Sequence, residues 1–299
     1  MKRIIPYYIH SNTCGVTIYD YLKSQGYSNP CITTLKKTNH SICINSRWEY
    51  MNYRLQDGDC LTVTINETNS STTILPREIP LSIVYEDEDI LVVNKQANLP
   101  IHPSMNHYED TLANGIMHYF HKQHIPHTFR CMNRIDKDTT GLVLLAKHFV
   151  SSSILSKQIQ GNTVKREYLA IISGTPTPLV GTINAPIGRV ADSSIEREVQ
   201  DTGETAITHY ETLQSNEKYS LIRLRLETGR THQIRVHMQW IGHPLLGDTL
   251  YHLDEFNSPL SRQALHSSRL SFLHPIKNEA FSLVAPLPND MKKVLRNLL

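Results

Sequence analysis

Residues 129–147 read Phe-Arg-Cys-Met-Asn-Arg-Ile-Asp-Lys-Asp-Thr-Thr-Gly-Leu-Val-Leu-Leu-Ala-Lys. The apolar run Leu142–Leu145 predicts a strand that is buried on both faces. Arg134 and Asp136 come just before this run, in a loop that a buried strand would hold rigidly. A carboxylate beside a guanidinium in such a loop is typical of a reactive group that is kept ionised. A simpler interpretation is also open: Asp-Thr-Thr-Gly at 138–141 is typical of a turn, and Asp136 can cap it.

The composition is that of a soluble globular protein. A length of 299 residues suits one large domain and a small one. No apolar run is long enough for a membrane helix, and the basic N-terminus lacks the apolar core of a secretory signal. The five cysteines form no Cys-x-x-Cys pair, which argues against a disulfide framework or a structural zinc site and favours a cytoplasmic location. The 16 histidines are scattered, so we assign no metal.

Charge is distributed unevenly along the chain. The formal net charge is only +2, which does not by itself indicate nucleic acid. Residues 76–120 carry two basic and seven acidic side chains, whereas residues 121–170 carry eight basic and three acidic ones. The basic segment surrounds Asp136, so a phosphate-rich ligand would be attracted there. A merely solvated basic face would have the same composition.

A polar stretch at 67–73, followed by Pro76 and Pro80, predicts a linker. It divides the chain into a small domain at 1–66, a linker at 67–80 and a larger domain at 81–299. In the small domain the patterns predict two helices and two strands, at Val16–Gln25, 29–37, Ser41–Asn45 and Cys60–Ile65.

The larger domain begins with a predicted hairpin. Its strands are Ser82–Tyr85 and Ile90–Asn94. Helices are predicted at 111–123 and Phe149–Gln160. Strict alternation at 222–227 predicts a half-buried strand, with Ala206–Leu213 as its partner. Thr231 is positioned to cap a helix that runs to Trp240, with Gly242 just past its end.

The segment around Asp136 resembles the catalytic motif of the RluA-type pseudouridine synthases, Arg-Leu-Asp followed by Thr-Ser-Gly and an apolar strand. Ile135 and Thr140 replace the Leu and the Ser, and Asn133 stands where the family often has His. Three further blocks follow the family pattern in order: 94–103, where Gln96 and Asn98 replace Pro and Gly; 164–174, around Tyr168; and 229–237. Gly247-Asp248 and 264–266 are similar to the closing motifs of the family, which we interpret as scaffold. The resemblance covers nearly the whole larger domain.

The resemblance implies roles for individual residues. Asp136 would be the catalytic nucleophile or base, Tyr168 would stack on the target uracil and assist proton transfer, and Arg235 would pair with Asp136. Arg134 would fill the space left by an extruded uridine. The remaining predicted RNA contacts are Arg166, in the Lys position of the family's Lys-x-Tyr motif, and Arg230 and His232, near the start of the helix.

The first 66 residues resemble the alpha-L RNA-binding module of the ribosomal-protein-S4 type. In that interpretation Lys36, Lys37 and Arg47 contact phosphates. An unrelated small α+β domain fits the same pattern. The module favours ribosomal RNA over transfer RNA as the substrate.

Together these inferences predict an α+β protein with a mixed, largely antiparallel central sheet, flanking helices and a central catalytic cleft, plus a small N-terminal α+β module. The expected activity is that of a monomeric RNA pseudouridine synthase, an isomerase without metal or cofactor. Two alternatives stay open at this point. Asp136 and Asp138 can hold Mg²⁺ in a nucleotidyl or glycosyl transferase, and the same basic surface suits a non-catalytic RNA-binding protein.

Overall fold

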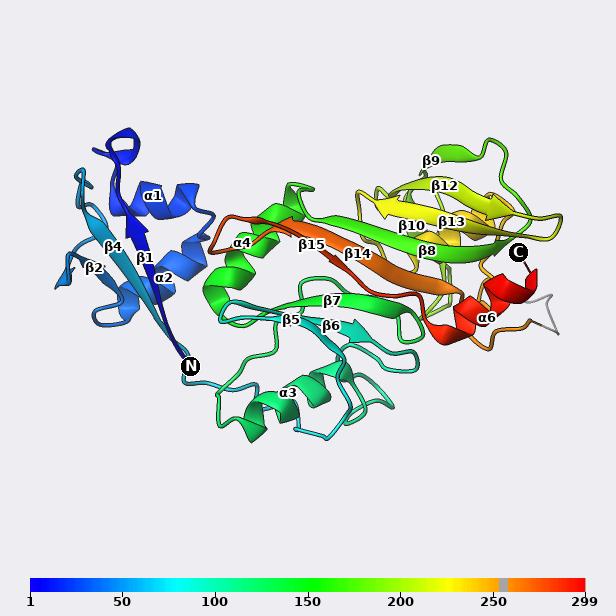
Figure 1. Cartoon of the computed structure of the whole chain (residues 1–299), viewed down its shortest axis with the longest axis horizontal. Coiled ribbons are helices and arrows are strands. Elements are labelled where there is room, and N and C mark those ends of the chain that lie inside the picture. The colour runs from blue at the N-terminus through cyan, green and yellow to red at the C-terminus, as the bar shows by residue number, and fades with distance from the viewer. Residues whose placement is uncertain (253–257, 299) are drawn as a thin grey trace.

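The computed structural model describes residues 1–252 and 258–298, in which a small N-terminal sheet and a large sheet are each flanked by helices (Figure 1). No helix in these ranges is both long and apolar enough to cross a membrane. The architecture is α+β, as predicted.

The N-terminal sheet has the strand order β1-β4-β2-β3, and two helices pack on one of its faces. Its elements are β1 (Lys2–Tyr8), α1 (Ile18–Ser24), α2 (Asn29–Lys37), β2 (Ile42–Ile44), β3 (Arg47–Trp48) and β4 (Cys60–Asn66), with a short 3-10 turn at Ser11–Thr13. The sequence predicted both helices, β2 and β4. It did not predict β1, because Pro6 interrupts the strand pattern; proline is tolerated there since β1 lies at the edge of the sheet.

The large sheet runs β5-β6-β7-β14-β8-β13-β12-β9, with β15 paired to the far part of β14. Its strands are β5 (Ile83–Glu86), β6 (Ile90–Lys95), β7 (Thr140–Ala146), β8 (Lys165–Ser173), β9 (Val180–Asn184), β12 (Ile207–Ser215), β13 (Tyr219–Leu226), β14 (Leu265–Leu273) and β15 (Ala280–Val284). A separate hairpin joins β10 (Ile187–Arg189) to β11 (Arg197–Val199). Within the described strands of the large sheet, β7 and β14 pair in parallel and the other pairs are antiparallel, so the sheet is mixed and largely antiparallel.

Strand β7 is the centre of the core. Every one of its residues is buried, which confirms the prediction from the run Leu142–Leu145. Its parallel contact with β14 is very close: a Cβ on Gly141 would lie 2.2 Å from the carbonyl oxygen of Ser267, and Gly141 has a φ of +111°. Glycine is required here both for space and for backbone conformation.

Four helices accompany the large sheet. They are α3 (Leu112–Lys122), α4 (Phe149–Gln160), α5 (Gln233–Trp240) and α6 (Asn289–Leu298). Helix α4 lies between the large sheet and the N-terminal module (Figure 1): Leu155 packs with the core around β7, while Val150 and Ile154 join the core of the module. Arg3 adds a polar contact, 2.8 Å from the buried carboxylate of Asp89.

Residues 67–80 contain no helix or strand, but they are attached along their length. The carboxylate of Glu67 is buried, where it accepts hydrogen bonds from Arg130 and from the Phe149 amide. Ile74 packs against α3. This segment therefore follows the surface of the larger part of the chain.

Candidate active site

The loop between Asn133 and β7 is fixed by its own side chains. The buried amide of Asn133 donates to the Leu142 carbonyl at 3.0 Å and accepts from the Leu144 amide at 2.7 Å, so it is bonded to β7 like a strand neighbour. The Thr139 amide donates to the Asp136 carbonyl, which closes a main-chain turn. The Asp136 carboxylate takes no part in that turn, and it points to Arg235 instead. The turn-capping interpretation of Asp136 is therefore wrong.

Two buried basic side chains, Lys95 and Arg262, donate hydrogen bonds to backbone carbonyls of the same loop. The ammonium of Lys95, at the end of β6, donates to the carbonyls of Gln96 and Lys137 at 2.8 Å each. Burial lowers the pKa of Lys95 to about 7, against the opposing charges of Asp138 and Asp136. Arg262 donates to the Asp138 carbonyl at 3.1 Å.

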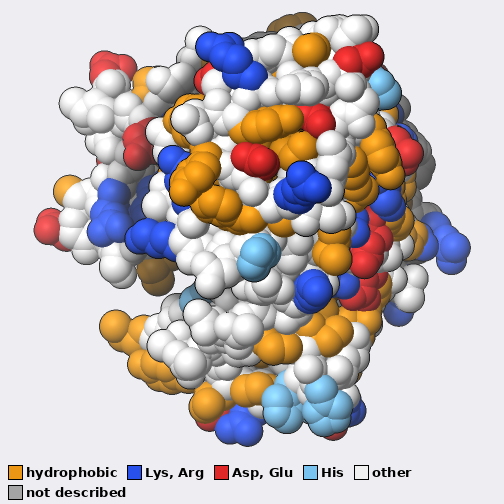
Figure 2. Space-filling model, turned by 90° about the vertical axis from the view of Figure 1, so that its left-hand side faces the viewer, with side chains coloured by type: hydrophobic (Ala, Val, Ile, Leu, Met, Phe, Trp, Pro, Cys, Tyr) orange, Lys and Arg blue, Asp and Glu red, His pale blue; other side chains and the backbone are white. Residues whose placement is uncertain are grey.

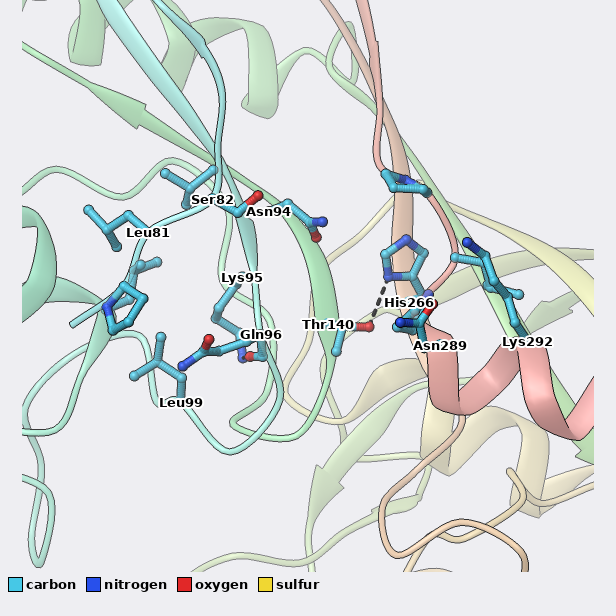
Figure 3. Close-up of a pocket in the computed structure, with 16 residues that line it drawn as sticks. Leu81, Ser82, Asn94, Lys95, Gln96, Leu99, Thr140, His266, Asn289 and Lys292 are labelled. Atoms are coloured by element: carbon cyan, nitrogen blue, oxygen red, sulfur yellow. Dashed lines mark hydrogen bonds between the residues drawn. The ribbon is translucent and has the colours of Figure 1, made fainter.

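Lys95 lines a pocket between β6, β7, β14 and α6, where Thr140 and His266 also meet, 2.8 Å apart (Figure 3). The Asp136 side chain does not line this pocket. It lines a second one, together with Arg134, Tyr168, His232 and Arg235. The loop thus contacts Lys95 on one side and carries the predicted site residues on the other.

Two ionic contacts orient the guanidinium of Arg235, on α5. Its Nη1 lies 3.2 Å from the Asp136 carboxylate. Its Nε and Nη2 donate to both carboxylate oxygens of Asp248, at 2.7 and 2.8 Å. Burial alone would lower the pKa of Arg235, but the hydrogen bonds and charge of Asp248, together with Asp136, raise it. The Asp136 side chain keeps 27% of its surface exposed, whereas that of Asp248 is fully buried. Asp136 can therefore reach a ligand, and Asp248 cannot.

Tyr168 lies in the middle of the sheet. It is on β8, opposite Ser267 of β14 and Leu224 of β13. Only 4% of its surface is exposed, and burial raises the pKa of its phenol, with Arg166 and Ser267 opposing the shift. The ring is thus a neutral aromatic wall of the pocket that contains Asp136.

Helix α5 starts differently from the prediction. Its first residue is Gln233, and the N-cap position is His232, in a left-handed conformation with a φ of +57° and without a capping side chain. The prediction that Thr231 caps the helix is wrong. The unusual backbone conformation brings His232 into the pocket, where its Nδ1 lies 2.9 Å from the hydroxyl of Tyr251. Tyr251 also lies under Arg235, with the guanidinium carbon 5.0 Å from the ring centre.

Of the other predicted RNA contacts, one lines this pocket and the rest lie outside it. Arg134 lines it and is exposed. Arg166 packs beside Gly229 and donates to the Thr228 carbonyl. Arg230 pairs with Glu204 at 2.5 Å and donates to the Thr205 carbonyl. The N-terminal residues Lys36, Lys37 and Arg47 are exposed on the small module, away from the pocket.

Comparison with known proteins identifies the family. A sequence model described as RNA pseudouridylate synthase matches residues 89–240. An RNA pseudouridine synthase of Bacillus subtilis, YjbO, is 42% identical over 281 residues, which are 94% of this chain and 99% of that protein. The chain belongs to the RNA pseudouridine synthase family. It is an isomerase that converts uridine in RNA to pseudouridine.

Other pseudouridine synthases are similar over much of their length. Ribosomal large subunit pseudouridine synthase D of Vibrio cholerae is 39% identical over 251 residues, which are 80% of this chain and 76% of that protein. The structure called human RNA pseudouridylate synthase domain containing 4 superposes with a TM-score of 0.59 at 24% identity, and covers 73% of this chain and 92% of its own. The latter likeness concerns the fold.

Membership of this family argues against the two alternative functions. Asp136 shares a guanidinium with Asp248, and Asp138 accepts a hydrogen bond from the Asn98 amide, so the two carboxylates do not form a joint metal site. In the described ranges, the side chains grouped closely enough to hold an ion are Asp87, Asp89 and His274, elsewhere in the fold.

Sequence reasoning missed three residues at this site. The sequence indicates only a scaffold role for Asp248 and no role for Lys95 or Tyr251. Asp248 and Lys95 lie in blocks that resemble the family, and this resemblance was the signal that could have assigned them to the site. Spacing in the sequence could not predict their contacts, because Lys95 and Lys137, for example, are 42 positions apart.

Proposed function

We propose that this pseudouridine synthase modifies uridines in ribosomal RNA and that Asp136, Tyr168 and Arg235 are its catalytic residues. The single observation that carries the residue assignment is their convergence on one pocket, with Asp136 partly exposed and 3.2 Å from Arg235. Support for the substrate comes from relatives named ribosomal large subunit pseudouridine synthase D, at 38–40% identity.

The reaction breaks the bond between C1′ and N1 of uridine, turns the uracil and joins C5 to C1′. C5 gives up its hydrogen to solvent as a proton and N1 takes up a proton, so the product is an isomer of the substrate and no oxidant, reductant or acceptor molecule is needed. The carboxylate of Asp136 acts either as nucleophile or as base at the sugar–base linkage. Arg235 balances its charge, and Asp248 prevents the guanidinium from turning away. The ring of Tyr168 supports the detached uracil, and its protonated phenol can donate or relay a proton.

A uridine inside folded RNA reaches this pocket only after it leaves its stack. Arg134 is exposed at the rim, and no hydrogen bond or ion pair holds its side chain within the described residues. It is free to fill the vacated space and to contact phosphate. His232, Arg166 and Arg230 lie around the same end of α5 and would contact the RNA nearby.

We also propose an organisation of the chain into a module, a linker and a catalytic domain. Residues 1–66 form an alpha-L-type RNA-binding module with Lys36, Lys37 and Arg47 as phosphate contacts, 67–80 form a linker, and 81–299 form the catalytic domain. The enzyme acts as a monomer in the cytoplasm.

Tritium release from RNA labelled at C5 of uridine tests the activity directly, because C5 loses its hydrogen when it joins C1′. We expect release from ribosomal RNA that persists in EDTA. Comparison of pseudouridine positions in RNA from cells with and without the protein identifies the substrate. Loss of pseudouridines from transfer RNA alone would contradict the ribosomal assignment.

A further inference from the structure

We propose that the outer face of the N-terminal sheet, around Trp48, Tyr50 and Tyr8, binds an unpaired stretch of the substrate RNA by base stacking. The inference deepens the proposed function and rests on it. It concerns a different surface from the phosphate contacts assigned to Lys36 and Lys37, which lie on α2 at the other face of the sheet.

The strands of this sheet have a covered side and an open side. Alternate residues are buried against α1, α2 and α4: Ile5 on β1, Ile42 and Ile44 on β2, and Leu61, Val63 and Ile65 on β4. The residues between them point the other way. One row across this open side is Pro6, Thr62, Cys43 and Trp48, which are directly paired neighbours on β1, β4, β2 and β3. This row contains no charged side chain.

The aromatic side chains on this side are exposed to an unusual degree. Trp48 is 44% exposed, Tyr50 66% and Tyr8 67%. The rings of Trp48 and Tyr50 touch edge to face, with their centres 4.4 Å apart. The turn before Trp48 is tight, since both Asn45 and Ser46 have positive φ, at +49° and +68°. Such a hairpin presents the rings rigidly, at a small cost in conformational entropy on binding.

The charge around the aromatic rings suits RNA. Residues 1–66 contain seven Lys and Arg against four Asp and Glu, while the whole chain is only +2. Lys2 is exposed on the same side of β1 as Pro6 and Tyr8. Arg47 is exposed immediately before Trp48, although its pairing with Ile44 directs it from the helix side of the sheet. Figure 2 views the molecule from this side and shows apolar and basic side chains interspersed, with acidic ones among them.

Among possible partners, these features favour single-stranded RNA. Stacking on aromatic rings beside basic groups is how proteins bind unpaired nucleotides, and every base offers a flat face for it. Trp48 and the β1 end of its row are three strand spacings apart, about 14 Å, which is room for a few nucleotides. A second copy of this chain would bring another net positive module to the same surface.

The chain contains only two tryptophans, which makes the surface directly observable. In a Trp240→Phe protein, Trp48 is the only tryptophan, and we expect its fluorescence to be quenched saturably by a ten-nucleotide oligouridine. In the otherwise native chain, Trp48→Ala and Tyr50→Ala should each raise the KM for a ribosomal RNA fragment by about 5- to 150-fold with kcat within two-fold. Trp48→Phe should restore most of the affinity. Trp240→Ala removes the other tryptophan, which is 56% exposed and lies in the larger domain, and it should change neither constant.

Absence of quenching, or an unchanged KM in both alanine variants, would overturn the inference. It would also be overturned if Trp48→Ala converted a dimer to a monomer, measured by light scattering, without weakening RNA binding. Failure of the proposed function gives a different result. In that case no RNA releases tritium with the native enzyme, while the quenching of Trp48 by oligouridine persists.

Discussion

Asp248 determines which way the guanidinium of Arg235 faces. It holds two of the guanidinium nitrogens, which leaves the third for Asp136. A bidentate carboxylate of this kind fixes both position and orientation. The site therefore depends on a residue that no substrate can touch.

We expect Asp248→Asn to lower kcat by about 10- to 100-fold through misorientation of Arg235, with little change in KM. Steady-state tritium release measures both constants. Glu67→Gln is a matched control, since Glu67 is also buried and bonded to an arginine, Arg130, but lies far from the pocket. If both variants lost activity equally, the effect would be one of general stability and not of positioning.

His127 makes stability depend on pH. It is buried against Phe120, and burial, with the charges of Arg130 and Lys147, lowers its pKa to about 3. A histidine in the unfolded chain titrates near its ordinary pKa of about 6.5. Between these values the unfolded chain binds the extra proton, so the free energy of unfolding falls as pH decreases from about 6.5 towards 3.

We expect His127→Leu to make that decline shallower, measured by urea denaturation at several pH values. His121→Leu, on the exposed side of α3, should leave the slope as it is. An unchanged slope in His127→Leu would show that other groups cause the pH dependence.

At the scale of secondary-structure elements, the junction of β7 with β14 positions the site. Thr140 and Gly141 pair with His266 and Ser267, more than a hundred residues later in the chain. The loop with Asp136 enters this junction from one side, and Tyr168 lies on the next strand. An error in this pairing would displace both residues.

Gly141→Ala should destabilise the protein by at least about 3 kcal/mol, because it adds a backbone clash to the cost of a positive φ. Gly242→Ala is the control: Gly242 also has a positive φ, +82°, but a Cβ there meets nothing within 4 Å. It should cost about 1–2 kcal/mol. Equal losses in urea denaturation would contradict the close approach of the two strands.

Local patterns explain which elements the sequence predicted. The run Leu142–Leu145, the hairpin of β5 and β6, and helices α3 and α4 each have a pattern that is complete within one segment. Strand β14 and its junction with β7 could not be predicted this way, because they depend on pairing between distant segments. Helix α5 was predicted with the wrong cap, since nothing in the residue types indicates that His232 adopts a left-handed conformation.

At the scale of the whole molecule, helix α4 joins the two parts. Its residues Val150 and Ile154 are buried in the core of the N-terminal module, although the sequence placed this helix in the larger domain. The amide of Ser28 also donates to the hydroxyl of Ser153 on α4, at 2.8 Å. The prediction of separate domains from composition gave no information about this contact, because an interface has no local pattern.

Ile154→Ala should lower the free energy of unfolding of the module by about 2–5 kcal/mol, as expected for a buried isoleucine. Hydrogen exchange of amides in β4 measures this effect directly. Ile195→Ala, at a residue that is 61% exposed, should have almost none. Unchanged exchange in β4 would mean that the module does not rely on α4.

The central claim is that the carboxylate of Asp136 performs the isomerisation. The most direct measurement compares Asp136→Asn with the native enzyme, by tritium release and by binding of the same RNA fragment. We predict no detectable turnover in the variant, with RNA affinity within a few-fold of native. Retained turnover would contradict the account.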